Sequence, residues 1–264
     1  MEKIINGVNC KIVPNEWSVY FDMALTMLTE IIKNNKKGKE TVMIVPVGPT
    51  QHYPILAEMV NRLGVSLKNV HFFNMDEYLI DPNTVISHND KMSFHKRMND
   101  EFYNKIDRQL VMDVDHRHFP IPGKESAYDA LIEELGGVDL CIGGLGINGH
   151  VAFNEADDII SAEEFANLGT RVLKISRETR TINAYGYQRG DLAGMCEWCI
   201  TVGMKQIINS RNIYIALNRP WQNGPFKHSL YDDETGLWPA SLLRRNKNLT
   251  YCTTAEIFEG IENR

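Results

Sequence analysis

The chain has 264 residues and is mildly acidic, with 28 lysines and arginines against 34 aspartates and glutamates and a formal net charge of −6. This charge argues against a nucleic-acid partner, and because no run of about 18 apolar residues occurs, we expect no membrane span. The first residues lack the apolar core of a signal peptide, and the five cysteines are an odd number. Both features predict a cytoplasmic protein without a disulfide framework.

Short apolar runs typical of buried strands alternate with amphipathic helical patterns along the chain. Asn15 can cap a helix from Glu16 to Asn35, because apolar residues recur at i, i+4 spacing between positions 19 and 31. The other predicted elements are strands at 41–45, 70–75, 138–142, 172–175, 212–217 and 249–252, the last at a sheet edge, and helices around 56–63, 92–107 and 126–135.

This alternation predicts parallel β–α–β units with right-handed crossovers. No internal repeat and no linker composition divides the chain. We therefore predict one doubly wound α/β domain over residues 1–264, with a mainly parallel sheet flanked by helices in a Rossmann-like, three-layer arrangement.

A glycine-rich stretch at 143–155 follows the strand at 138–142. Four glycines fall within seven residues there, which predicts a tight loop where a ligand can approach backbone N–H groups. His150 lies at the end of this loop, between Asn148 and Glu155. A histidine titrates near neutral pH, and an amide or carboxylate beside it can fix its tautomer. A glycine-rich loop is a weak signal by itself, so a structural histidine in a strand-to-helix turn remains an alternative.

Two further segments end predicted strands. Asp76 and Glu77 follow the strand at 70–75, and ligands of open α/β sheets bind at the carboxyl ends of strands. A surface Asp-Glu turn is the alternative. The turn at 46–50 precedes a helix, whose N-terminus could hold an anion.

Metal binding receives little support from the sequence. His116 and His118 stand two residues apart in a polar loop, but no cysteine or carboxylate spacing accompanies them. Cys196 and Cys199 form a lone CxxC without a second pair, which indicates a structural role. We expect no metal site.

Three motifs together resemble the glucosamine-6-phosphate deaminase (isomerase) family. They are Asn74-Met75-Asp76-Glu77-Tyr78, the stretch from Gly143 to Glu155, and Ile200-Thr201-Val202-Gly203, and the similarity spans about residues 40–217. The related 6-phosphogluconolactonases share Gly149-His150 and the segment 239–243. They usually lack the Phe-Asn-Glu continuation at 153–155, so the deaminase branch is favoured.

The resemblance implies ring opening, aldose–ketose isomerisation and deamination of an amino-sugar phosphate. The expected reaction converts glucosamine 6-phosphate to fructose 6-phosphate and ammonia, or acts on a close analogue such as galactosamine 6-phosphate. The resemblance implies that Asp76 removes the C2 proton, that His150 acts on the ring oxygen during ring opening, and that Glu155 holds the His150 imidazole in place. Asn148 replaces the aspartate of many members and would orient His150. No metal or organic cofactor is implied.

The expected partner is a small-molecule sugar phosphate, and a homo-oligomer is possible within the family. The residues expected to contact the substrate are Gly48, Pro49, Thr50, Glu77, Gly144, Gly146, Gly149, Arg180 and Lys227.

The phosphate-binding half departs from the family pattern. The turn at 46–50 is shorter and poorer in hydroxyl groups than the family's phosphate loop, and Tyr185 stands where the family has a phosphate-binding arginine. Either Lys227, His52 or Arg180 binds the phosphate, or the substrate is not phosphorylated. A lactonase-like hydrolase and a non-catalytic sugar-binding homologue are the alternative functions.

Overall fold

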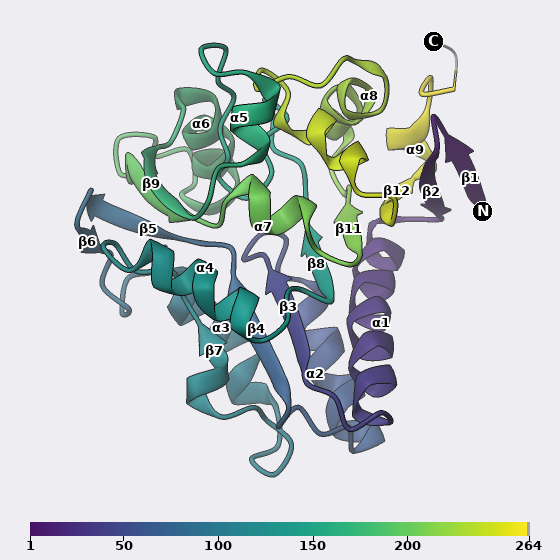
Figure 1. Cartoon of the computed structure of the whole chain (residues 1–264), viewed down its shortest axis with the longest axis vertical. Coiled ribbons are helices and arrows are strands. Elements are labelled where there is room, and N and C mark those ends of the chain that lie inside the picture. Colours follow the sequence, from purple (N-terminus) through teal and green to yellow (C-terminus); the bar gives the residue numbers. More distant parts are fainter. Residues whose placement is uncertain (263–264) are drawn as a thin grey trace.

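A computed structural model describes residues 1–262, apart from the side chain of Tyr187. An eight-stranded sheet in the order β1-β2-β12-β11-β8-β3-β4-β7 forms its centre (Figure 1). All neighbouring strands of this sheet are parallel except β1 and β2. The strands are β1 (Glu2–Ile5), β2 (Val8–Val13), β3 (Thr41–Val45), β4 (Val70–Asn74), β7 (Arg117–His118), β8 (Leu140–Gly143), β11 (Ile213–Ala216) and β12 (Leu249–Thr254).

Helices cover both faces of this sheet and enclose two apolar clusters. One cluster joins the sheet to α1, α2 and α3, and the other joins it to α4, α7 and η4. The α-helices are α1 (Glu16–Asn35), α2 (His52–Leu63), α3 (Phe94–Glu101), α4 (Glu125–Glu134), α5 (Ala162–Ala166), α6 (Arg177–Tyr187), α7 (Met204–Ile208), α8 (Asn223–Tyr231) and α9 (Ala255–Phe258). The 3₁₀ helices are η1 (Tyr103–Lys105), η2 (Val114–His116), η3 (Pro220–Gln222) and η4 (Pro239–Arg245). The predicted α/β class with helices on both faces is confirmed.

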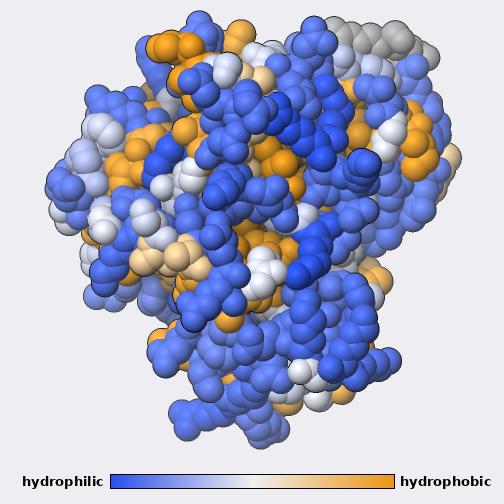
Figure 2. Space-filling model, viewed as in Figure 1, coloured by the Kyte–Doolittle hydropathy of each residue, from blue (hydrophilic) through white to orange (hydrophobic). Residues whose placement is uncertain are grey.

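Local sequence accounts for α1 as expected. The Asn15 side chain accepts a hydrogen bond from Ser18 N at 2.9 Å, which satisfies a free donor of the first turn. Val19, Met23 and Met27 are fully buried against the sheet. No helix of the described residues is long and apolar enough to cross a membrane, and the face in Figure 2 is mainly hydrophilic with scattered apolar patches.

Three adjacent strands bring the candidate segments to one edge of the sheet. β3 lies between β8 and β4, and all three are parallel, so their carboxyl ends lie side by side. Met75 N donates to Val45 O at 2.9 Å, and a Cβ atom on Gly143 would lie only 3.1 Å from Met75 Cε. The loop after β8, the turn after β3 and Asp76 therefore start from neighbouring positions.

A second sheet, which the sequence did not predict, begins at Asp76. Its order is β6-β5-β10-β9, and its strands are antiparallel (Figure 1). They are β5 (Asp76–Asp81), β6 (Thr84–Val85), β9 (Arg171–Lys174) and β10 (Trp198–Thr201). Asp76 and Glu77 therefore begin a strand, and the alternative of a surface turn is wrong.

The prediction of an edge strand at 249–252 is also wrong. β12 lies between β11 and β2 inside the large sheet. The N-terminal strands β1 and β2 were not expected, and β2 covers the edge that β12 would otherwise expose.

Candidate active site

The loop after β8 is shaped around the His150 side chain. A Cβ atom on Gly146 would lie 1.9 Å from Cε1 of the imidazole, so any other residue there would displace the ring. Gly149 has φ +75°, and a Cβ atom there would lie 2.6 Å from the Trp238 ring. The absence of a side chain at Gly146 makes room for the His150 ring, and its absence at Gly149 makes room for Trp238. The contact of these glycines with substrate remains a prediction.

His150 is linked to Glu155 through Asn148. Nδ1 of His150 lies 2.7 Å from Asn148 Oδ1, and Asn148 Nδ2 donates to Glu155 Oε2 at 2.6 Å. An ionised carboxylate only accepts hydrogen bonds, so the amide nitrogen must face Glu155 and the amide oxygen must face His150. Nδ1 therefore carries the proton. Nε2 has no hydrogen-bond partner within residues 1–262 and is available to a substrate.

The first turn of α6 adds two hydrogen bonds to Glu155 that the sequence interpretation did not assign, one from the Ser176 backbone and one from the Thr179 side chain. Ser176 N donates to Glu155 Oε1 at 3.3 Å, and Thr179 Oγ1 donates to Glu155 Oε2 at 3.1 Å. Thr179 Oγ1 also lies 3.2 Å from His150 Nδ1. The Ser-x-x-Thr pattern after a predicted strand could have indicated a helix start, but not its contact with Glu155.

Burial sets the charge of the imidazole. The His150 side chain is 13% exposed, and its Nδ1 lies 3.8 Å from Glu155 Oε2. Desolvation lowers the pKa of His150, and the Glu155 carboxylate opposes this shift. A neutral imidazole with a free Nε2 can accept a proton from a bound hydroxyl group and return it elsewhere.

Asp76 is a buried carboxylate without a donor. It is 6% exposed, and no hydrogen bond to its side chain occurs within the described part of the chain. Burial raises the pKa of Asp76 well above its ordinary value, and the neighbouring charge of Glu77 raises it further. Asp76 pairs with Thr201 across the small sheet, and Thr201 Oγ1 accepts from Phe153 N at 3.0 Å. One strand pair thus connects Asp76 to the loop of His150, without a direct hydrogen bond between them.

Glu77, unlike Asp76, is buried among hydrogen-bond donors. Its two oxygens accept from the backbone N–H groups of Tyr78, Phe94 and His95 and from Ser93 Oγ, at 2.8 to 3.0 Å. Three of these donors belong to the beginning of α3, so Glu77 holds that helix in place. These four donors occupy the Glu77 oxygens, and a contact between Glu77 and substrate stays a prediction.

The turn after β3 adjoins the His150 loop. A Cβ atom on Gly144 would lie 3.7 Å from Pro49 Cδ. The N-terminus of α2 has no side-chain cap, and Thr50 N donates to Gln51 Oε1. His52 is fully buried, and burial lowers its pKa to about 3. His52 is therefore neutral and cannot be the phosphate-binding cation.

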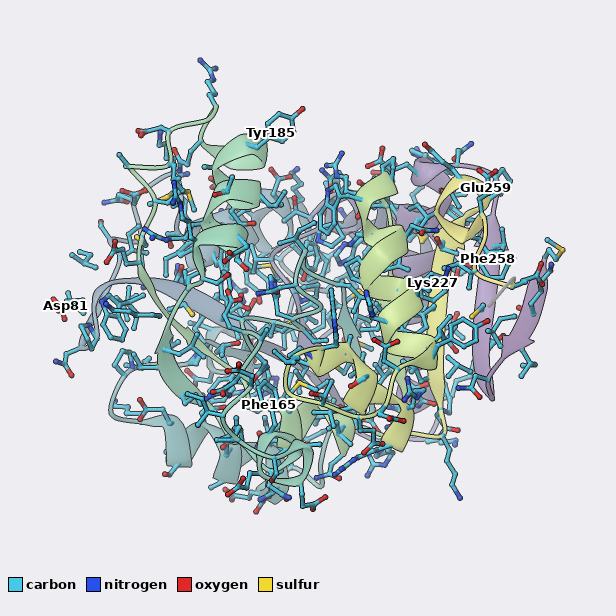
Figure 3. All side chains as sticks on the ribbon, turned by 90° about the horizontal axis from the view of Figure 1, so that it is seen from above. Asp81, Phe165, Tyr185, Lys227, Phe258 and Glu259 are labelled. Carbon is cyan, nitrogen blue, oxygen red and sulfur yellow. The ribbon has the colours of Figure 1, made fainter. Side chains whose placement is uncertain are left out.

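The other candidate cations, Arg180 and Lys227, differ in whether they already have an ion-pair partner. Arg180 forms an ion pair with Glu197 at 3.1 Å. Tyr185 is 83% exposed and projects from the outer end of α6 (Figure 3). Lys227 lies on α8 and has no ion-pair or hydrogen-bond partner within residues 1–262 (Figure 3). Lys227 is the better candidate for an anionic group.

No group of three or more His, Cys, Asp and Glu residues among those described could hold a metal ion. His118 Nε2 lies 3.1 Å from Nδ1 of His71, and His116 stacks on the same ring. Cys196 and Cys199 are free thiols. His116 and His118 thus pack against His71, and Cys199 is buried.

Glu77→Gln should destabilise the protein, because an amide cannot accept from all four donors. We expect a loss of about 1–3 kcal/mol in the free energy of unfolding, measured by urea titration. Glu58→Gln, on the exposed face of α2, is the control and should change the free energy by less than about 0.5 kcal/mol. Equal effects of the two substitutions would contradict the assigned role of Glu77.

Asp76→Asn should stabilise the protein at neutral pH, because ionisation of a buried carboxylate favours the unfolded chain. The pKa of Asp76 is raised in the folded state, so wild-type stability falls as pH rises from about 3.9 towards that raised pKa. The variant lacks this loss. Urea titrations at pH 4 and pH 8 should therefore show a gain only at the higher pH, and a gain of equal size at both would refute the assignment.

Comparison with known proteins supports a family assignment. No family model matches the chain. A glucosamine-6-phosphate deaminase of Caenorhabditis elegans is 30% identical over 195 residues, which cover 72% of this chain and 68% of the relative. The glucosamine-6-phosphate deaminase of Borreliella burgdorferi (strain ZS7) is 27% identical over 243 residues, 86% of each chain.

Solved structures share the fold. A monomeric glucosamine-6-phosphate deaminase superposes with a TM-score of 0.81 at 21% identity, over 94% of this chain and 98% of the other. The 6-phosphogluconolactonase from Leishmania guyanensis gives 0.69 at 18% identity, over 95% and 97%. With these relatives and the motifs described above, the chain belongs to the glucosamine-6-phosphate deaminase family.

Proposed function

We propose that this protein opens, isomerises and deaminates an amino-sugar phosphate, either glucosamine 6-phosphate or an analogue such as galactosamine 6-phosphate. The main support is that two different groups follow neighbouring strands at one edge of the sheet. Asp76 is a buried carboxylate without a partner among the described residues, and His150 is an imidazole oriented by Asn148. Family membership supports the same activity. We further propose that residues 1–264 act as one cytoplasmic catalytic domain without a cofactor.

Ring opening is assigned to His150. Its free Nε2 accepts the proton of the C1 hydroxyl group and returns it to the ring oxygen as the C1–O5 bond breaks. The imidazolium that forms transiently keeps its Nδ1–H on Asn148, and Glu155 supplies the nearby negative charge. Asn148 itself cannot carry this charge, so orientation and charge come from two different residues.

Isomerisation and deamination follow from the open-chain aldehyde. Asp76 takes the proton from C2 and delivers it to C1, while the C1 oxygen gains a proton released by the substrate's ammonium group. The C1 carbonyl thereby becomes a hydroxyl group, and C2 becomes doubly bonded to its nitrogen. Water then adds at C2 and ammonia leaves, so that a ketose remains. A carboxylate whose pKa is raised by burial is a stronger base than an exposed one, which suits removal of a proton from carbon.

Substrate contacts are proposed for the turn Gly48–Thr50, the glycines of the His150 loop and Lys227. Lys227 is proposed as the phosphate ligand because it has no partner among the residues that the structure describes, whereas Arg180 forms an ion pair with Glu197. Arg180 would then contact the substrate only after that ion pair opens.

Ammonia release and C2 proton exchange test the activity. Wild type should release ammonia from at least one member of a panel of hexosamine phosphates and free hexosamines. Asp76→Asn should bind the sugar but lose solvent-deuterium incorporation at C2, seen by NMR, by roughly 10²–10⁴-fold. Undiminished exchange would remove Asp76 from the role of base. Hydrolysis of a phosphogluconolactone without ammonia release from any sugar would favour the lactonase alternative.

His150→Gln should separate ring opening from isomerisation. It should impair turnover of the closed sugar by about 10²-fold or more, but turnover of an open-chain analogue much less, because that analogue bypasses the step. Comparison of kcat on the two substrates measures this ratio, and equal losses would contradict the assignment.

Lys227→Met should weaken binding of the phosphorylated sugar. We expect KM to rise about 10-fold or more with little change in kcat, because a remote charged contact acts on binding. Lys36→Met, at the exposed end of α1, is the control and should leave KM unchanged. An unchanged KM in Lys227→Met would instead favour a substrate without a phosphate group.

A further inference from the structure

The first turn of α6 lies against the side chains that orient His150. Ser176 is the N-cap of α6, and its Oγ accepts from Thr179 N at 3.1 Å. Thr179 is 1% exposed, and its hydroxyl oxygen lies 3.0 Å from Ser176 Oγ, 3.1 Å from Glu155 Oε2 and 3.2 Å from His150 Nδ1. A buried hydroxyl group with three polar neighbours must have a defined proton arrangement.

That arrangement follows from the number of donors and acceptors. A threonine hydroxyl has one proton and two lone pairs, and a carboxylate has no proton to give. The Thr179 proton therefore points to Glu155. Its lone pairs accept from Ser176 Oγ–H and share the Nδ1–H of His150 with Asn148 Oδ1. The network has no consistent arrangement in which His150 Nδ1 lacks its proton.

The presence of Asn148 makes this network necessary. An aspartate at position 148 could only accept, and would fix the proton on Nδ1 of His150 by itself. An asparagine presents either a donor or an acceptor according to the rotation of its amide. The amide stays in the required orientation because Nδ2 donates to Glu155 Oε2, and Glu155 is held in turn by Thr179 and Ser176.

We propose that Thr179 is a positioning residue for the reaction: it fixes Glu155, and through Glu155 and Asn148 it holds the neutral His150 in the Nδ1–H tautomer with Nε2 towards the substrate. The mechanistic consequence rests on the proposed function above. The tautomer itself does not, because it follows from the contacts alone.

Thr179→Val removes the hydroxyl group and keeps the shape. On a closed-ring substrate kcat should fall about 10-fold or more, which is the effect of losing one hydrogen bond to a charged group, while KM changes less than about twofold. The loss should be smaller on an open-chain analogue. Thr179→Ser restores the hydroxyl group and should recover most of the activity.

Thr181→Val is the matched control. Thr181 lies on the same helix, is exposed, and its hydroxyl group donates only to Arg177 O. Its substitution should leave kcat and KM unchanged. Equal losses in Thr179→Val and Thr181→Val, or no recovery in Thr179→Ser, would overturn the proposal.

Nitrogen-15 NMR of the histidine rings tests the tautomer without any substrate. The His150 signals, assigned by their absence in His150→Gln, should show the Nδ1–H form in wild type and a larger share of the Nε2–H form in Thr179→Val. An Nε2–H form in wild type would overturn the proposal even if Thr179→Val failed to fold. If wild type has no deaminase activity but shows the Nδ1–H form, and Thr179→Val shifts the ring towards the Nε2–H form, the proposed function fails and the positioning of His150 by Thr179 stands.

Discussion

The candidate site depends on Asp76, a carboxylate that is buried without a hydrogen-bond donor among the described residues. Removing a charged carboxylate from water without a hydrogen-bond donor costs on the order of several kcal/mol, and the protein meets this cost at Asp76 by raising its pKa. The next residue, Glu77, is equally buried but is surrounded by four donors. Consecutive residues of a strand point to opposite faces, so β5 can give adjacent carboxylates opposite surroundings. Asp76 is left without a donor among residues 1–262, and Glu77 bonds to the beginning of α3.

The small antiparallel sheet makes this separation possible. It begins at the residue after the large sheet's β4 and Met75, so the chain leaves one sheet and enters the other at Asp76. Pairing with Thr201 fixes the position of Asp76, and the Thr201 hydroxyl group accepts from the segment that follows His150. Asp76 and His150 are thus connected through strand pairing and the Thr201 hydroxyl group and not by a hydrogen bond to each other.

Local signals were sufficient for much of the fold. The spacing of Val19, Met23 and Met27 predicted α1, and the order of the strands β3, β4, β8 and β11 predicted the parallel sheet. The small sheet escaped prediction because its strands have two to six residues, and because its central pair, β5 and β10, joins segments more than a hundred positions apart. Strand β12 was placed at an edge because nothing local indicated that β2 would pair with it.

The site, like the fold, has some parts that the sequence predicted and others that only the folded chain reveals. Motif spacing identified Asn148, His150 and Glu155, and the structure joins them by direct hydrogen bonds. Motif spacing could not reveal the contact of Thr179 with Glu155, because helix α6 meets Glu155 only in the folded chain. The role of His52 was also beyond local sequence, because it depends on complete burial. Hydrogen-bond partners and desolvation are tertiary properties, and these determine charge.

Direct titration of the carboxyl groups tests whether burial raises the pKa of Asp76. Carbon-13 NMR of protein labelled at aspartate and glutamate side chains would follow Asp76, assigned by the signal missing in Asp76→Asn. We predict that the Asp76 carboxyl group titrates well above the ordinary aspartate pKa of about 3.9, because burial favours its protonated form. A titration at or below that ordinary value would show a solvated or hydrogen-bonded carboxylate and would contradict the burial of Asp76 without a donor.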